Sequence, residues 1–235
     1  MSNPNKPLSK VSGAGEISAF LNKAKALAPQ QQGGNGRLLF ALDATASREP
    51  VWDRASQIQS QMFLEAAKIG SLNIKLAFYR GFMDCQGLPW TADTAAMLKQ
   101  MGRIRCEAGT TQIARLLKLA INEHKAARLN AMVFVGDCME EDPDQLTRLA
   151  GQLGISGVPV FVFQDGHDPI AEKTFREIAR LTRGVWCRFD ASSPDQLRDL
   201  LCGVAVYAAG GQKALKAFSN NKAGLLKQLT NQLGK

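Results

Sequence analysis

The sequence is poor in the residues that many enzyme centres and disulfide-stabilised folds require. It has two histidines and five cysteines among 235 residues, and no two cysteines form a C-x-x-C pair. Two histidines offer little to a zinc hydrolase, and an odd number of scattered cysteines argues against a disulfide framework. The cysteine pattern fits thiols that are kept reduced, so we expect a cytoplasmic protein.

Long hydrophobic segments are also missing. No stretch reaches the roughly 18 unbroken apolar residues of a membrane helix, and the richest run, 200–209, is interrupted by Gly203. Residues 1–7 lack the apolar core of a secretory signal. We therefore expect no membrane span, whereas the 45% of apolar residues is enough for a hydrophobic core.

Several enzyme signatures are absent or misplaced. The chain has no P-loop and no serine nucleophile elbow, and the glycines of 33–36 precede a strand where a dinucleotide site needs them after one. A phosphotransferase of the haloacid dehalogenase type needs a second aspartate two residues after the first, and Thr45 stands there after Asp43. A metal-dependent hydrolase or nuclease stays open as the enzyme alternative, with Glu140 or Glu141 as further ligands.

Positive charge is concentrated at the two ends of the chain. The formal net charge is +8, residues 1–36 contain four lysines and one glutamate, and residues 211–235 contain five lysines and no acid. Residues 37–210 therefore carry equal numbers of basic and acidic side chains. A basic scaffold that binds nucleic acid through its ends is a further alternative, which the lack of interleaved aromatics and of an RNA-binding signature disfavours.

What the sequence does contain is a regular alternation of short apolar runs and amphipathic stretches. The alternation predicts a mostly parallel sheet with helices on both faces, and the strand at 73–79 is expected to have one wetter face. Strands are expected near 37–43, 73–79, 83–90, 131–136, 158–163 and 185–189, and helices near 16–27, 51–69, 91–101, 112–125, 142–153, 169–181, 193–209 and 212–233.

The stretch 38–47 carries the main chemical signal. Five apolar residues run into Asp43, and oxygen-bearing side chains then recur at every second position, at Thr45 and Ser47. One carboxylate and two hydroxyls suit a hard cation such as Mg²⁺. Asp137 also follows an apolar strand, and ligands of parallel sheets bind at the carboxyl ends of strands.

The charged residues beside these motifs have simpler interpretations. Arg48 and Glu49 follow Ser47 and are expected to be exposed loop charges. The acids at 140, 141, 142 and 144 are expected at the N-terminus of the helix that follows them, where the helix dipole favours negative charge.

Taken together, the polar residues at these strand ends resemble the metal-ion-dependent adhesion site of the von Willebrand factor type A (vWA) domain. That family combines a D-x-S/T-x-S motif, a later threonine in a G-G-T-like loop and an aspartate that ends the fourth strand. The matching residues in this chain are Asp43, Thr45, Ser47, Thr110 and Asp137.

The chain departs from the family pattern at a few positions. Thr45 replaces the commoner serine and keeps the hydroxyl, and Ala108 replaces the first glycine before Thr110. Gly136 and Cys138 flank the aspartate where the family often has threonine and glycine. None of these changes removes one of the oxygens that the resemblance assigns as metal ligands.

The resemblance implies a three-layer, Rossmann-like α/β fold. Its sheet would have six mostly parallel strands, with one short antiparallel edge strand, and helices on both faces. The vWA domain would span residues 37–210, after an N-terminal tail with an amphipathic helix and a Gln/Gly linker at 1–36 and before a basic helix at 211–235. Strands one and four would be neighbours, which would bring Asp43 and Asp137 together.

The resemblance also implies metal-dependent protein binding or assembly rather than catalysis. The matched residues would hold Mg²⁺ or Mn²⁺, with Ca²⁺ as a poorer fit. An Asp or Glu of an unidentified protein partner would fill the remaining coordination position. The single-domain members of the bacterial cytoplasm are the best match within the family.

Overall fold

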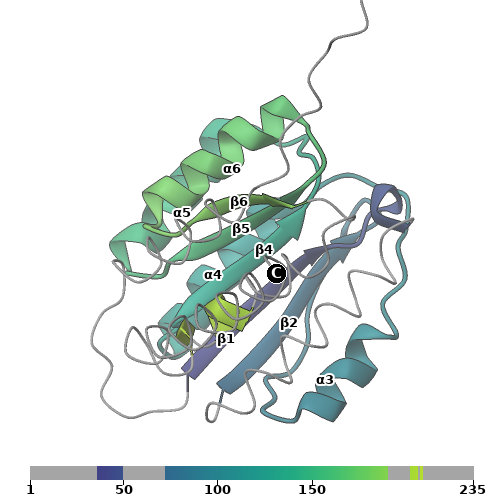
Figure 1. Ribbon diagram of the computed structural model, residues 1–235, viewed down its shortest axis with the longest axis vertical. Coiled ribbons are helices and arrows are strands. Elements are labelled where there is room, and N and C mark those ends of the chain that lie inside the picture. Colours follow the sequence, from purple (N-terminus) through teal and green to yellow (C-terminus); the bar gives the residue numbers. More distant parts are fainter. Residues whose placement is uncertain (1–35, 50–71, 190–201, 206, 209–235) are drawn as a thin grey trace, which may run out of the picture.

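The computed structural model describes residues 36–49, 72–189, 202–205 and 207–208, which form a layered α/β arrangement (Figure 1). A six-stranded sheet lies in the middle, in the order β3-β2-β1-β4-β5-β6. All strands pair in parallel except β3, which runs antiparallel to β2, so the predicted sheet is confirmed. The strands are β1 (Gly36–Asp43), β2 (Leu72–Arg80), β3 (Asp84–Gly87), β4 (Ala131–Gly136), β5 (Val160–Asp165) and β6 (Trp186–Phe189).

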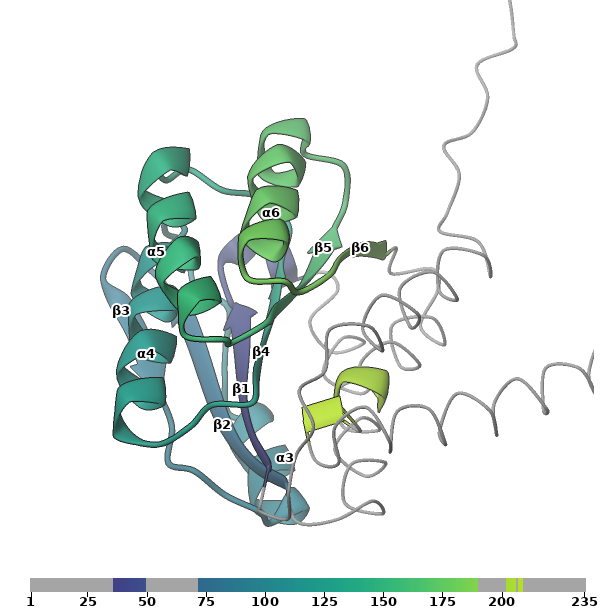
Figure 2. The same cartoon turned by 90° about the vertical axis from the view of Figure 1, so that its left-hand side faces the viewer.

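Helices cover both faces of this sheet, as predicted (Figure 2). One face is covered by α4 (Ile113–Ala126), α5 (Pro143–Ile155) and α6 (Pro169–Leu181). The other face is covered by α3 (Thr94–Met101) and by the helical residues 202–205 and 207–208.

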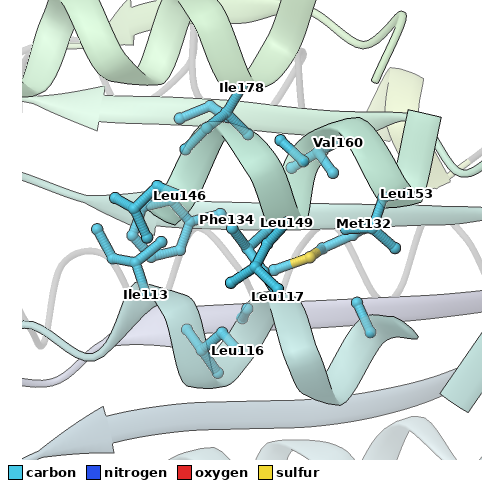
Figure 3. Close-up of a cluster of buried hydrophobic side chains, with 14 of the residues drawn as sticks. Ile113, Leu116, Leu117, Met132, Phe134, Leu146, Leu149, Leu153, Val160 and Ile178 are labelled. Carbon is cyan, nitrogen blue, oxygen red and sulfur yellow. The ribbon is translucent and has the colours of Figure 1, made fainter. Parts of the chain in front are cut away.

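The two faces of the central strands are both buried, because their sequences are continuous apolar runs. Leu38, Phe40 and Leu42 of β1 face the α3 side, whereas Leu39 and Ala41 face the α4 side. Figure 3 shows the α4-side core, where side chains of α4, α5 and α6 converge on β4 and β5. This double burial fixes the strand ends that carry the polar residues.

The α4-side core is organised by aromatic packing. Phe134 meets Phe175 edge to face, with 5.5 Å between the ring centroids, and Tyr79 stacks against Phe134 at 6.5 Å. The expected wetter face of the second strand is therefore wrong at Tyr79, which is fully buried under α4. Lys75, Ala77 and Tyr79 lie on the same face of β2, and their mixed polarity in the sequence does not reveal that α4 covers this face.

Helix boundaries follow the capping residues. Asp93 caps α3 by accepting hydrogen bonds from the backbone of Ala95 and Ala96, so α3 begins at Thr94 and not at Thr91. Thr91 instead forms a bridge to Ile74 of β2. Asp142 and Asp168 cap α5 and α6, each followed by a proline in the first turn.

Several predicted elements lie outside the described residues. These are the helices at 16–27, 51–69 and 212–233, most of the helix at 193–209, and the segments 1–35 and 211–235. Among the residues that the structure does describe, no helix is long and apolar enough to cross a membrane.

Candidate metal centre

The candidate centre lies where the strand order reverses. β1 has β2 on one side and β4 on the other, which confirms the predicted adjacency of strands one and four. Leu42 pairs with Val135 across β1 and β4, so Asp43 and Asp137 both lie at the carboxyl ends of these neighbouring strands. Polar groups in this position face the crevice where parallel sheets bind ligands. In Figure 1 it is the end to which the β1 and β2 arrowheads point, beside η1 (Ala46–Arg48).

Asp43 is buried and accepts three hydrogen bonds. Its Oδ1 accepts from the backbone N–H of Thr45 at 2.8 Å and from the Thr45 hydroxyl at 2.6 Å. Its Oδ2 accepts from the hydroxyl of Tyr79 on the adjacent strand at 2.9 Å. Only 1% of Asp43 is exposed, so these bonds hold the carboxylate in one orientation.

The hydroxyl protons of the motif are then assigned by elimination. Thr45 has one hydroxyl proton and gives it to Asp43, so in the 3.1 Å contact between Thr45 and Ser47 the serine is the donor. Both lone pairs of the Ser47 oxygen therefore accept no hydrogen bond from Thr45 or Asp43, and the Ser47 side chain is exposed. The Ser47 oxygen can therefore accept a cation without giving up a protein hydrogen bond.

The electrostatics around Asp43 favour an added positive charge. Burial raises the pKa of Asp43 from its ordinary value to about 6, the Thr45 hydrogen bonds oppose this, and the charge of Asp137 raises it again. Among the described residues, no cationic side chain offsets these effects. Burial and the charges of Asp137 and Asp43 likewise raise the pKa of the Cys138 thiol to about 12.

The loop that carries Thr110 is fastened to both neighbouring loops. Glu107 forms a bridge with Thr45 and donates its backbone N–H to Ala44 at 3.1 Å. The backbone N–H of Thr110 donates to Gly81 at 3.2 Å. Within the described part of the chain, the Thr110 side chain makes no hydrogen bond to the other four predicted ligands, so it joins them by loop position alone.

A glycine next to Thr110 is required by this close approach. A Cβ atom built on Gly109 would lie 1.9 Å from the carbonyl oxygen of Gly81, a separation that no side chain can tolerate. Gly81 itself has φ +56°, a conformation that favours glycine. The glycine that survives of the family's usual pair is therefore the one that the backbone contact demands.

Two glutamates after Asp137 fasten the third loop to the second. Glu140 exchanges hydrogen bonds with Thr111, carboxylate to N–H at 3.1 Å and N–H to hydroxyl at 3.0 Å. Glu141 accepts from the backbone of Ile113 at 2.6 Å and of Ala114 at 2.8 Å, which caps α4. The expectation that these two glutamates serve the helix that follows them is therefore wrong, because Glu141 caps the start of α4 and Glu140 holds Thr111 in the loop before it.

Arg48 is also placed differently from the sequence-based expectation. It is 2% exposed rather than a free loop charge, because its guanidinium forms an ion pair with Asp165 at the end of β5. The positive charge nearest to the motif in sequence is thus committed to another carboxylate. Glu49 is exposed, as expected.

The donors present fit a hard divalent cation. Two carboxylates can balance its charge, and the hydroxyls of Thr45, Ser47 and Thr110 are neutral oxygen donors. In the described part of the chain, no group of three or more His, Cys, Asp or Glu side chains could hold a metal, and a cation at this edge would need these hydroxyls as well.

Two supporting residues were not predicted from the sequence. The hydroxyl of Tyr79 and the carboxylate of Glu141 act across strand and loop pairings, and nothing local in the sequence marks them. The parallel register of Asp43 with Tyr79 could have identified the first, once β1 and β2 were known to pair.

The fold has clear counterparts among solved structures. A von Willebrand factor type A protein from Catenulispora acidiphila matches with TM-score 0.59 and 16% identity, over 74% of this chain and 43% of that one. The VWA domain of SpRpn10 matches with TM-score 0.57 and 16% identity, over 72% and 94% of the two chains. An aerotolerance-related membrane protein from Bacteroides fragilis matches with TM-score 0.55 and 18% identity, over 71% of this chain and 98% of that one.

These likenesses are structural, and they concern the fold. No family model matches the sequence, and no curated protein matches it. The chain spans less than half the length of the Catenulispora protein, and nearly the whole of the other two. Sheet order, the antiparallel edge strand and these counterparts agree, and this chain therefore has the fold of a von Willebrand factor type A domain.

Proposed function

We propose that this protein binds a partner protein through a divalent cation, Mg²⁺ or Mn²⁺, held at the carboxyl ends of β1 and β4. Asp43, Thr45, Ser47, Thr110 and Asp137 would supply the oxygen ligands, directly or through water. An Asp or Glu of the partner would complete the coordination shell, and the vWA fold supports a role of this kind.

The observation that carries this proposal is a pair of carboxylates, Asp43 buried and Asp137 half-buried, whose charges no cationic side chain of the described residues offsets. Asp43 is held in place by Thr45 and Tyr79, and Asp137 lies close enough for their charges to repel. Arg48, the cationic side chain of the same loop, is committed to Asp165. An arrangement that repels itself in isolation is stabilised when a cation binds between the two carboxylates.

The neutral donors explain why an outside carboxylate is needed. Mg²⁺ prefers six oxygen ligands, and hydroxyls contribute oxygen without charge. A cation balanced by only two protein carboxylates stays electrophilic toward a third. We therefore assign the third carboxylate to the partner, and the scattered thiols of the sequence support placing this binding in the cytoplasm.

The acids nearest to the centre are occupied in a way that favours binding over hydrolysis. A hydrolase would need Glu140 or Glu141 on the metal. Both oxygens of Glu141 accept hydrogen bonds from α4, and Glu140 is tied to Thr111. Recruiting Glu141 to a metal would release the start of α4, and recruiting Glu140 would release Thr111 in the loop before it.

The proposal is tested by affinity capture on the immobilised chain. Cell extract of the source organism is passed over the native chain, Asp43→Ala and the control Asp144→Ala, in Mg²⁺ and in EDTA. We expect a protein that is retained by the native chain and the control in Mg²⁺, is released by EDTA, and is missing from Asp43→Ala. Retention that is equal in EDTA, or equal on Asp43→Ala, would contradict the proposal.

A further inference from the structure

The turn between β2 and β3 presents two large apolar side chains to solvent. Phe82 is 70% exposed and Met83 is 78% exposed, whereas the aromatic residues of the neighbouring strands are buried. Single exposed apolar residues are ordinary on protein surfaces, whereas contiguous exposed apolar patches mark interaction sites, and here two such side chains are adjacent on one turn. We call Phe82 and Met83 the apolar tip.

Side chains of Gln112 and Arg115 hold the backbone of the apolar tip in place through hydrogen bonds. The side-chain amide of the buried Gln112 donates to the carbonyls of Arg80 and Gly81, both at 3.1 Å. The guanidinium of Arg115 donates to the carbonyl of Met83 at 2.6 Å. The tip is therefore preorganised, and little conformational entropy is lost when a ligand packs against it.

The apolar tip adjoins the candidate metal centre. Asp43 pairs with Tyr79 in the register of β1 and β2, and the tip begins three residues beyond Tyr79 at the same end of the sheet. The residue before the tip, Gly81, accepts the hydrogen bond from the backbone of Thr110. A ligand bound at the metal therefore has the tip beside it.

We infer that the partner segment combines an acidic side chain, which binds the metal, with an apolar side chain a few residues away, which packs on Phe82 and Met83. This inference rests on the proposed function, because the metal supplies the anchor for the acid. Arg115 lies beside the tip, but its charge already acts on Asp84, so we assign recruitment of the acid to the metal alone.

The occupant is a different protein rather than a tail of this chain. Residues 211–235 contain no acidic side chain, and residues 1–36 contain only Glu16. The lysine-rich ends therefore offer the metal no acid within residues 211–235 and a single one, Glu16, within residues 1–36. A second copy of this chain is the competing occupant, and the experiment below distinguishes it from a different protein by measuring self-association.

The experiment measures binding of labelled nonapeptides to the full chain by fluorescence anisotropy in Mg²⁺ and in EDTA. Each peptide has a central Glu in a Gly/Ser background, with Leu or Phe placed in turn at every flanking position, and a matched set has Gln in place of Glu. The chains compared are the native form, the double variant Phe82→Ser/Met83→Ser, Asp43→Ala, and the control Ile155→Ser. Ile155 is 91% exposed at the far end of α5, so the control removes a comparable side chain away from the tip.

We expect the best apolar neighbour to raise the affinity of the Glu peptide about tenfold for the native chain and for Ile155→Ser. The double variant should keep Mg²⁺-dependent and Glu-dependent binding but lose this gain. We expect the double variant to fold, because both substituted side chains are exposed in the native chain. Circular dichroism and the melting temperature check this.

Three outcomes overturn the inference, and they differ in what they say of the metal. If binding needs Glu and Mg²⁺ but the apolar gain is absent or survives in the double variant, the apolar tip is not the docking surface and the proposed function stands. If no peptide shows Glu and Mg²⁺ dependence, the proposed function fails as well. If the native chain self-associates through Phe82 and Met83 without peptide, as sedimentation would show, the tip is an interface between copies.

Discussion

Two carboxylates, one near each end of α4, differ in whether a cationic side chain pairs with them. Near its start, Asp43 is surrounded by hydroxyls and a second carboxylate, and burial raises its pKa to about 6. Near its end, Glu123 contacts Arg37, Lys75 and the indole N–H of Trp90. Burial raises the pKa of Glu123, but these contacts outweigh it and hold the pKa below its ordinary value.

This difference separates a carboxylate whose charge is paired within the fold from one whose charge no cationic side chain of the described residues pairs. The charge of Glu123 is neutralised within the fold, and Arg37 also lies over the Trp90 ring, 4.0 Å from its centroid. The charge of Asp43 is held in place by hydrogen bonds but is not neutralised by any described residue. The first arrangement stabilises the fold, and the second would be stabilised by an added cation.

The largest effect is expected from breaking the loop contact at the metal end. Gly109→Ala would place a methyl group 1.9 Å from the backbone of Gly81, and neither loop can give way without losing hydrogen bonds. We expect the free energy of unfolding to fall by about 3 kcal/mol. Urea denaturation measures it, and Mg²⁺ binding should be lost with it.

The matched control for this change is Gly151→Ala in α5. A Cβ atom on Gly151 would meet nothing within 4 Å, and alanine is the better helix former. The control should gain about 0.5–1 kcal/mol of stability. An equal loss of unfolding free energy in the two variants would show that the close contact of Gly109 with Gly81 does not determine stability.

The second effect concerns the other end of α4. Glu123→Gln keeps the shape of the side chain but leaves Arg37 and Lys75 without their common acid, whose side chain is 17% exposed. We expect a loss of about 1–2 kcal/mol, since the hydrogen bonds to this charge are partly shielded from solvent. Mg²⁺ binding should be unchanged, and Glu177→Gln, at an exposed ion pair, should alter neither quantity.

The pH dependence of this pair follows from the direction of its pKa shift. Because the pKa of Glu123 is lowered in the folded state, its contribution is complete above its ordinary value of 4.5 and is lost as the pH falls through the lowered value. The stability difference between the native chain and Glu123→Gln should therefore be constant near neutral pH and shrink in acid. A difference that instead grew in acid would contradict the assignment.

The smallest effect is expected from Tyr79→Phe, which removes the hydroxyl that donates to Asp43. The lost hydrogen bond should cost about 1 kcal/mol of stability. Affinity for Mg²⁺ should fall about tenfold, because a residue that orients a metal ligand is removed. Calorimetric titration measures this, and an unchanged affinity would show that Tyr79 does not position Asp43 for the metal.

The sequence was informative where chemistry follows local pattern. Apolar runs and alternation placed five strands, and the short edge strand β3 was expected only as the return of a hairpin. The position of Asp43 and Asp137 at the ends of two apolar runs placed both at one edge of the sheet. It could not show pairings that depend on the folded arrangement, such as Arg48 with Asp165 or Glu141 with the start of α4. Tyr79 was misjudged for the same reason, since its burial depends on a helix that begins more than thirty residues later.

The central claim is that Asp43 belongs to a cation site, and Mn²⁺ titration of the full chain followed by electron paramagnetic resonance tests it most directly. The account predicts one Mn²⁺ per chain, displaced by Mg²⁺, retained in Asp144→Ala and lost in Asp43→Ala. The account would be contradicted if the native chain bound no stoichiometric Mn²⁺, or if Asp43→Ala bound it as well as Asp144→Ala does.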